Sequence, residues 1–166
     1  MKKKMLFIYN PRAGKSQIRS NLLDMIDIFV KAGYEVTAYP TQAQGDGIRA
    51  VTERQIGYYD MIACSGGDGT LDEVVTGMMN SEIRRPIGYI PAGSTNDFAN
   101  SRHIDSIATG AAKQISEGIV RDVDLGILEG KPFVYVAAFG MFADVSYLTS
   151  RENKQNFGHA AYVFSG

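Results

Sequence analysis

Three short glycine-containing segments, each directly after an apolar strand-like run, constrain the fold of this sequence most. The runs are Met5–Tyr9, Asp60–Cys64 and Pro86–Ile90. Apolar residues between the runs repeat at intervals of three and four, the period of a helix, most clearly in Ser16–Ala32. Strands that alternate with helices favour a mostly parallel sheet with helices on both faces. The predicted fold class is therefore α/β, with a Rossmann-like sheet.

Further elements continue this alternation. We expect one more strand and three more helices, at Tyr34–Tyr39, Asp46–Gln55, Leu71–Met79 and Ser106–Glu117. Gly33 is expected to end the first helix as a C-cap. Because ligands of open α/β sheets bind at the carboxyl ends of the strands, the glycine-containing loops should meet at one edge.

The pattern changes after Gly118. Residues 119–128 and 132–143 read as strands joined by a hairpin-like turn at 129–131. We therefore predict two domains, one over residues 1–125 and the beginning of an antiparallel, β-rich one over residues 126–166.

Composition limits the partners and the compartment. The net charge of −1 gives no broad attraction to nucleic acid. The single cysteine, Cys64, excludes an internal disulfide and suits the cytoplasm, and we expect it to be a buried, inert thiol. No apolar run is long enough to cross a bilayer. The basic run Lys2–Lys4 is either a solvated end or a weak contact with a membrane surface.

The first loop begins at Asn10 and contains Gly14-Lys15-Ser16. These three residues look like the end of a P-loop, but Tyr9 stands where that motif requires its first glycine. A glycine turn before a helix can still bind phosphate through backbone N–H groups. A plain structural turn is an equally open interpretation.

The second loop, Gly66–Thr70, gives the strongest signal. Gly66 and Gly67 allow close backbone approach to a phosphate, and Asp68 places a carboxylate at the bend. Thr70 and Glu73 have the spacing of a helix capping box. A turn followed by a cap explains Thr70 and Glu73 but not Asp68.

The third loop carries Ser94, Thr95, Asn96 and Asp97 in succession. All four are good N-cap residues, so the cap of a short helix is one interpretation. Four polar residues exceed the needs of one cap, and the other interpretation is that they bind phosphate, ribose oxygens or metal-bound water.

In order and spacing, the three loops resemble the diacylglycerol kinase catalytic-domain family, and its bacterial lipid kinases most of all. The matching motifs are Asn10-Pro11-x-Ala13-Gly14, Gly66-Gly67-Asp68-Gly69-Thr70-x-x-Glu73 and Pro91-x-Gly93-Ser94-x-Asn96-Asp97-Phe98-Ala99. The resemblance covers the whole chain. It implies an ATP-dependent lipid kinase with Mg²⁺, whose partners are ATP and a lipid alcohol, located in the cytoplasm with a peripheral membrane contact left open.

The resemblance also implies roles for particular residues, with ATP bound between the loops. The expected nucleotide-binding residues are Asn10, Pro11, Arg12, Ala13, Gly14, Thr41, Gly66, Gly67, Asp68, Gly69, Thr70, Leu71, Asp72, Glu73, Gly93, Ser94 and Asn96. The expected catalytic carboxylates are Asp68, Asp97 and Asp124, and Asp68 would also meet the Mg²⁺ carried by ATP. An ordinary turn residue is an equally open reading of Thr41 and of Asp124.

Two positions depart from the usual family pattern. Ser94 replaces a threonine and keeps the hydroxyl group, so little effect is expected. Asp72 replaces an asparagine and adds negative charge near a polyphosphate, which is expected to weaken ATP binding unless Mg²⁺ or a lysine offsets it.

In this family the second domain carries the glutamate base and a structural Mg²⁺ site. Residues 1–125 are therefore expected to be the nucleotide-binding kinase domain, and the chain to be a fragment that binds ATP or ADP weakly without kinase turnover. The lipid acceptor and the oligomeric state, a homo-oligomer included, stay open. The alternatives are an NAD kinase-like or phosphofructokinase-like enzyme, a non-catalytic nucleotide-binding module, and a lipid-binding scaffold.

Overall fold

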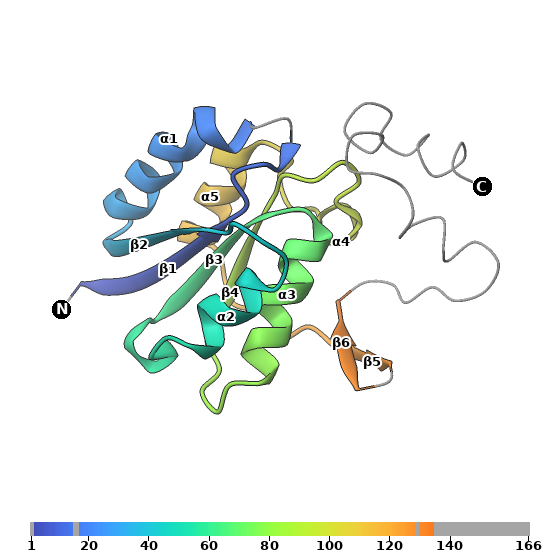
Figure 1. The fold of residues 1–166 in the computed structure, drawn as a ribbon. Coiled ribbons are helices and arrows are strands. Elements are labelled where there is room, and N and C mark those ends of the chain that lie inside the picture. The colour runs from blue at the N-terminus through green and yellow to red at the C-terminus, as the bar shows by residue number, and fades with distance from the viewer. Residues whose placement is uncertain (1, 15–16, 129, 135–166) are drawn as a thin grey trace.

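A computed structural model of the chain describes residues 2–14, 17–128 and 130–134. Its main body is a parallel sheet with the strand order β2-β1-β3-β4, and β5 and β6 form a small antiparallel sheet (Figure 1). The elements are β1 (Lys3–Tyr9), α1 (Gln17–Lys31), β2 (Tyr34–Pro40), α2 (Asp46–Thr52), η2 (Ile56–Tyr58), β3 (Met61–Gly66), α3 (Asp68–Met79), β4 (Ile87–Pro91), α4 (Asp97–Ser101), α5 (Ala108–Glu117), β5 (Gly126–Leu128) and β6 (Lys131–Phe133). The predicted α/β class is confirmed.

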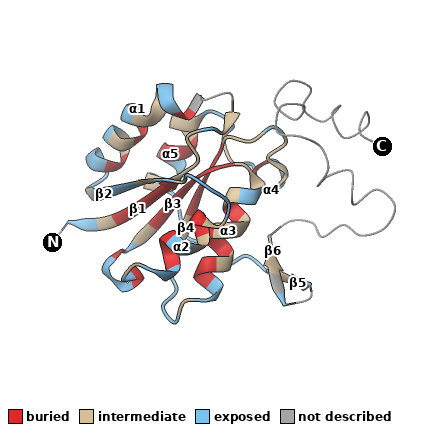
Figure 2. Ribbon diagram, viewed as in Figure 1, coloured by how far each residue is buried: buried red, intermediate tan, exposed pale blue. Residues whose placement is uncertain are grey.

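The central strand β1 is buried on both faces, because side chains alternate along a strand. Met5 and Phe7 pack in the layer of α1 and α5, whereas Leu6 and Ile8 pack in the layer of α2 and α3. Figure 2 shows the buried residues concentrated along the middle strands and on the inner sides of the helices. Each helical layer therefore has its own apolar core on one face of the same sheet.

Aromatic and small residues set the packing of the two layers. The rings of Phe7 and Phe29 meet edge to face, with centroids 5.5 Å apart, and this contact anchors α1 on the sheet. On the other face, a Cβ atom at Gly77 would lie 2.9 Å from the carbonyl oxygen of Ile48. Glycine at this position lets α3 lie directly against α2.

The end of α1 and the beginning of α3 were both predicted from capping signals in the sequence. The predicted C-cap at Gly33 is confirmed: this glycine has a φ of +90° and donates its N–H to Val30 O at 3.0 Å. The predicted capping box is wrong. Helix α3 begins at Asp68, its N-cap is Gly67, and Thr70 N–H donates to Gly67 O at 2.9 Å. Thr70 therefore lies inside the first turn.

Other boundaries differ from the prediction as well. The predicted strand over 119–128 is wrong except for β5, because Ile119 and Val120 are 84% and 66% exposed and pair with no strand in the described residues. Helix α2 ends at Thr52 and is followed by the 3₁₀ turn η2. Helix α4 follows the N-cap Asn96, as expected from one of the two interpretations of the third loop. The predicted strand over 132–143 lies mostly outside the described residues, which end here at residue 134.

The position of Cys64 agrees with the prediction. Its side chain is fully buried in β3, and burial raises the pKa of the thiol well above its usual range. Within the stretches that the structure describes, no helix combines the length and the apolar character needed to cross a bilayer.

Candidate nucleotide site

Backbone hydrogen bonds continue beyond the carboxyl ends of the strands and hold the loops together. Asn10 N–H donates to Ser65 O at 2.9 Å, and Ala92 N–H donates to Gly66 O at 2.8 Å. We name three segments by their central residues: the Asn10 turn (10–14), the Asp68 turn (66–70) and the Asn96 loop (91–97). The structure brings these segments to one edge of the sheet, as the topology predicted.

Asp68 connects the Asp68 turn to the Asn96 loop. Its Oδ2 accepts the N–H of Asp97 at 3.2 Å and the hydroxyl of Thr95 at 3.4 Å. Burial raises the pKa of Asp68, although the N–H groups of Asp97 and Phe98 act against this shift; the negative charge of Asp97 adds to it. The other oxygen, Oδ1, is buried and has no hydrogen-bond partner among the described residues. One carboxylate oxygen of Asp68 thus holds the loop, and the other makes no hydrogen bond within the described residues.

Two glycines bring the same segments into backbone contact. A Cβ atom at Gly93 would lie 2.7 Å from the Cα atom of Gly67 and 2.8 Å from Oδ1 of Asn96. Asn96, with a φ of 51°, accepts Gly93 N–H at 2.7 Å and donates to Gly93 O at 2.9 Å. The amide of Asn96 therefore closes its own loop, and glycine is required at position 93 for the close approach.

The Asn10 turn is also closed by its own polar groups. Oδ1 of Asn10 accepts the N–H of Arg12 at 3.0 Å, and the carbonyl oxygen of Asn10 accepts the N–H of Ala13 at 3.1 Å. Gly14 follows with a φ of +55°, a conformation that favours glycine. Lys15 and Ser16, which completed the P-loop-like sequence, lie outside the described residues.

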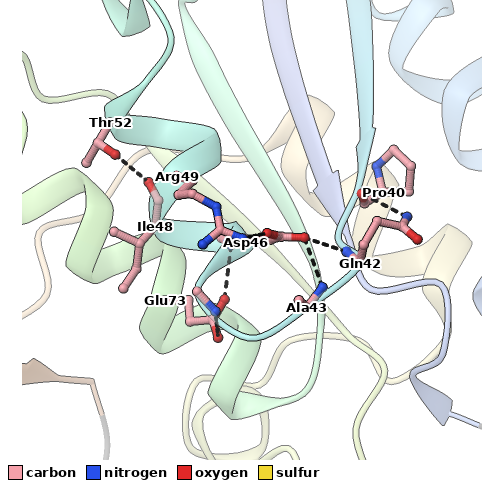
Figure 3. Close-up of polar contacts among 10 residues, drawn as sticks. Pro40, Gln42, Ala43, Asp46, Ile48, Arg49, Thr52 and Glu73 are labelled. Carbon is pink, nitrogen blue, oxygen red and sulfur yellow. Dashed lines mark hydrogen bonds and ion pairs between the residues drawn. The ribbon is translucent and has the colours of Figure 1, made fainter.

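Glu73 points away from the Asp68 turn. Its two carboxylate oxygens accept the N–H groups of Gly45, at 2.8 Å, and of Gly47, at 3.0 Å, at the beginning of α2 (Figure 3). Leu71, another predicted nucleotide contact, has its side chain in the apolar core. The side chains of Glu73 and Leu71 thus make their contacts within the protein, with the start of α2 and with the apolar core.

Asp72 lies one helical turn after Asp68 on α3. Burial raises the pKa of Asp72; the backbone N–H of Val134 acts against this shift, and the charge of Asp68 adds to it. Its Oδ1 is buried and without a hydrogen-bond partner in the described part of the chain. Asp72 therefore lies in a partly desolvated place next to Asp68.

The remaining predicted residues divide into two groups. Asp97 begins α4 beside Asp68, Ser94 is exposed in the Asn96 loop, and Thr41 N–H donates to Tyr9 O at 2.9 Å next to the Asn10 turn. Asp124 is exposed in the segment between α5 and β5, and no hydrogen bond or ion pair joins it to Asp68 within the described residues. The structure brings Asp68 and Asp97 together but not Asp124.

Two residues that support the site were not identified from the sequence. Tyr89 is 4% exposed, and its hydroxyl group donates to Gly66 O at 3.0 Å. This hydrogen bond holds the first residue of the Asp68 turn. Asp46 accepts the backbone N–H groups of Gln42 and Ala43. Tyr89 lies in the predicted strand-like run Pro86–Ile90, for which no polar role was expected, and the position of Asp46 at a helix start was the one signal available for its role.

No group of three or more His, Cys, Asp or Glu side chains is arranged to hold a metal ion within residues 2–14, 17–128 and 130–134. A Mg²⁺ ion bound to nucleotide phosphates requires fewer protein ligands, since it keeps water and phosphate oxygens in its shell. The free, buried Oδ1 of Asp68 is an oxygen of the kind that Mg²⁺ prefers.

Comparison with known proteins identifies the family and supports the fold. Residues 4–128 match the diacylglycerol kinase catalytic domain. The chain is 39% identical over 166 residues to proteins named diacylglycerol kinase from Staphylococcus aureus strains RF122 and MRSA252, and it spans 53% of their length, about half. A crystal structure of a putative diacylglycerol kinase from Bacillus anthracis has a TM-score of 0.73 and 32% identity, over 80% of this chain and 45% of that chain. The chain belongs to the diacylglycerol kinase catalytic-domain family.

Proposed function

We propose that this chain is the nucleotide-binding part of an ATP-dependent lipid kinase, which transfers the γ-phosphoryl group of ATP to a lipid hydroxyl group. Family membership and the names of the relatives support this function. The observation that carries it is Asp68, which holds the Asn96 loop with one oxygen and keeps a second, buried oxygen free at the glycine-rich edge of the sheet.

A polyphosphate fits the features of this edge. Gly14 has no side chain that would keep a phosphate from the backbone, whereas Gly67 and Gly93 let the Asp68 turn and the Asn96 loop approach each other. Backbone N–H groups at such turns bind anions, and a Mg²⁺ ion held by Asp68 would offset its charge. We propose that Asp68 and Asp97 face the Mg²⁺-bound phosphates and that the Asn10 turn and Thr41 bind the rest of the nucleotide.

The proposed reaction is a simple displacement. The lipid hydroxyl oxygen forms a bond to the γ-phosphorus while the bond to the β,γ-bridging oxygen breaks, and ADP leaves. The hydroxyl proton passes to a general base, which the family resemblance places in a second domain. The described residues would bind and orient the nucleotide, and the chain alone is expected to show no kinase turnover.

Calorimetric titration of ATP and ADP, with and without Mg²⁺, tests the nucleotide site. Wild type is expected to bind in a Mg²⁺-dependent manner. Asp68→Ala is expected to lose most of this dependence, and Asp24→Ala, at an exposed position on α1, serves as the matched control. Binding that is insensitive to Mg²⁺, or equally affected by both variants, would contradict the role of Asp68.

A phosphate-transfer assay separates the proposed function from its alternatives. A protein of the full length of the relatives is expected to phosphorylate a lipid alcohol and neither NAD nor a sugar phosphate. Transfer to NAD or to fructose 6-phosphate would favour the NAD kinase-like or phosphofructokinase-like alternative. Nucleotide binding without any transfer would favour a non-catalytic module, and strong turnover by the present chain would refute its proposed inactivity.

The lysines at the N-terminus lie at the opposite edge of the sheet from the proposed site. Lys4 Nζ lies 3.3 Å from the ring centroid of Tyr58, and the backbone N–H of Lys4 donates to Asp60. We propose that the lipid surface is met from the side of the Asp68 turn, so that Lys2–Lys4 do not guide the substrate.

A further inference from the structure

Two carboxylates from different helices hold the segment between β2 and α2. Oδ2 of Asp46 accepts the N–H groups of Gln42, at 2.6 Å, and of Ala43, at 2.9 Å. Glu73, on α3, accepts the N–H groups of Gly45 and Gly47 (Figure 3). Within a stretch of six residues, four backbone N–H groups are thus bound by carboxylates of the protein itself. We call residues 41–47 the Thr41 segment.

These contacts are short and partly buried. Asp46 is 6% exposed and also forms an ion pair with Arg49, and the N–H groups of Gln42 and Ala43 lower its pKa. A Cβ atom at Gly47 would lie 2.8 Å from Cβ and 3.0 Å from Oε2 of Glu73. The start of α2 therefore packs directly against Glu73, whose carboxylate already binds the N–H groups of Gly45 and Gly47.

We call the hydrogen bonds of Asp46 and Glu73 to the Thr41 segment the bracket. Both ends of this bracket reach the proposed nucleotide edge. At one end, the N–H of Thr41 donates to Tyr9 O, immediately before Asn10. At the other end, Glu73 lies on the same helix as Asp68, which begins α3. The bracket is thus a short structural link between the Thr41 segment and the Asp68 turn.

We infer that Glu73 and Asp46 are positioning residues, which fix the Thr41 segment relative to the Asp68 turn so that both can close on one nucleotide. Neither carboxylate needs to touch the nucleotide for this role. The inference rests on the proposed function for its ligand, a nucleoside triphosphate, but not for the geometry of the bracket.

Two substitutions disturb the bracket from opposite sides. Glu73→Gln replaces an acceptor oxygen with an NH₂ group, which cannot accept an N–H. Gly47→Ala keeps the carboxylate and displaces it. Glu53→Gln, at an exposed acid just after α2, is the matched control. The readouts are hydrogen exchange of single backbone amides by NMR and the Kd of MgATP.

Both bracket variants are expected to speed exchange at Thr41 and Gly45, to leave β1 amides such as Leu6 unchanged, and to raise the Kd roughly tenfold, the equivalent of about 1.4 kcal/mol. Their effects on Kd should be less than additive when combined, because they disturb one contact. Glu53→Gln should match wild type in every readout. If Glu73→Gln is too unstable to measure, Gly47→Ala carries the same comparison.

Unchanged exchange at Thr41 in the folded variants would overturn the inference, and so would unchanged MgATP affinity where wild type binds. If wild type binds no nucleotide, the proposed function fails for this chain. The positioning role is then decided by exchange at Thr41 alone: faster exchange in the variants supports it and unchanged exchange refutes it.

Discussion

Asp68 and Asp72 lie one helical turn apart on α3, and each has one buried carboxylate oxygen without a hydrogen-bond partner among the described residues. Burial raises the pKa of both side chains; the charge of Asp97 adds to the shift of Asp68, and the charge of Asp68 adds to the shift of Asp72. Two like charges with incomplete hydration oppose each other and also oppose an incoming polyphosphate. Position 72 is therefore the place where a conservative substitution should improve both stability and binding.

Asp72→Asn is expected to raise the Tm and to lower the Kd for MgATP. The amide keeps an oxygen that can accept the N–H of Val134 and removes the charge beside Asp68. A gain of about 1 kcal/mol would raise the Tm by roughly 2–4 °C for a chain of this size. Thermal unfolding and calorimetry measure the two effects, with Asp24→Asn on the surface of α1 as the control. A lower Tm at neutral pH would contradict the prediction.

The stability of wild type is expected to carry an unfavourable contribution from these two acids that grows with pH. Because their pKa values in the fold lie above the ordinary 3.8, the fold favours the protonated forms. The stability that the protonated forms of Asp68 and Asp72 contribute is complete below pH 3.8 and is lost as pH rises through the raised pKa values. Urea unfolding across pH 3 to 7 is expected to show this loss, and a smaller loss in Asp72→Asn.

Asp46 is expected to act in the opposite direction. Its pKa in the fold lies below 3.8, mainly because it accepts the N–H groups of Gln42 and Ala43. Its contribution is present above pH 3.8 and is lost as pH falls through the lowered pKa. Asp46→Asn should therefore destabilise the protein most at neutral pH and should differ less from wild type in strong acid. A difference that is independent of pH would contradict this account.

Gly93→Ala is expected to weaken MgATP binding and to cost about 1–3 kcal/mol of stability, because the new methyl group would meet the backbone of Gly67. The comparison is Gly69→Ala, where a Cβ atom would meet no heavy atom within 4 Å. At this position in the first turn of α3, alanine should stabilise the helix by up to about 1 kcal/mol. Equal losses of stability in both variants would show that the contact between Gly67 and Gly93 is not tight.

Much of the fold could be predicted from the sequence, because β1, β3 and β4 are continuous apolar runs and α1 has a clear helical period. The errors arise where local signals compete. Thr70 and Glu73 have the spacing of a capping box, but the carbonyl oxygen of Gly67 already starts the helix. Ile119 and Val120 favour a strand by residue type, yet no neighbouring strand exists for them in the described residues.

The place of the site could be predicted from the sequence, but the partners of its side chains could not. The loops follow parallel strands, so their shared edge is a result of topology and was foreseen. The partners of single side chains were not foreseen, because they depend on contacts that are distant in sequence. Glu73 reaches Gly45 at the N-cap of α2, and Tyr89 reaches Gly66 on another strand. Only the folded backbone brings these pairs together.

The alternation of side chains along β1 has a practical consequence. The carboxylates of the proposed site and its bracket belong to the α2 and α3 side or to the loops, whereas α1 covers the other face and carries none of them. Leu23 on α1 is 78% exposed, and the only cysteine of the chain is buried. Leu23→Cys therefore offers a single reactive thiol, through which a fluorophore or a surface tether can be attached while the nucleotide edge stays unmodified.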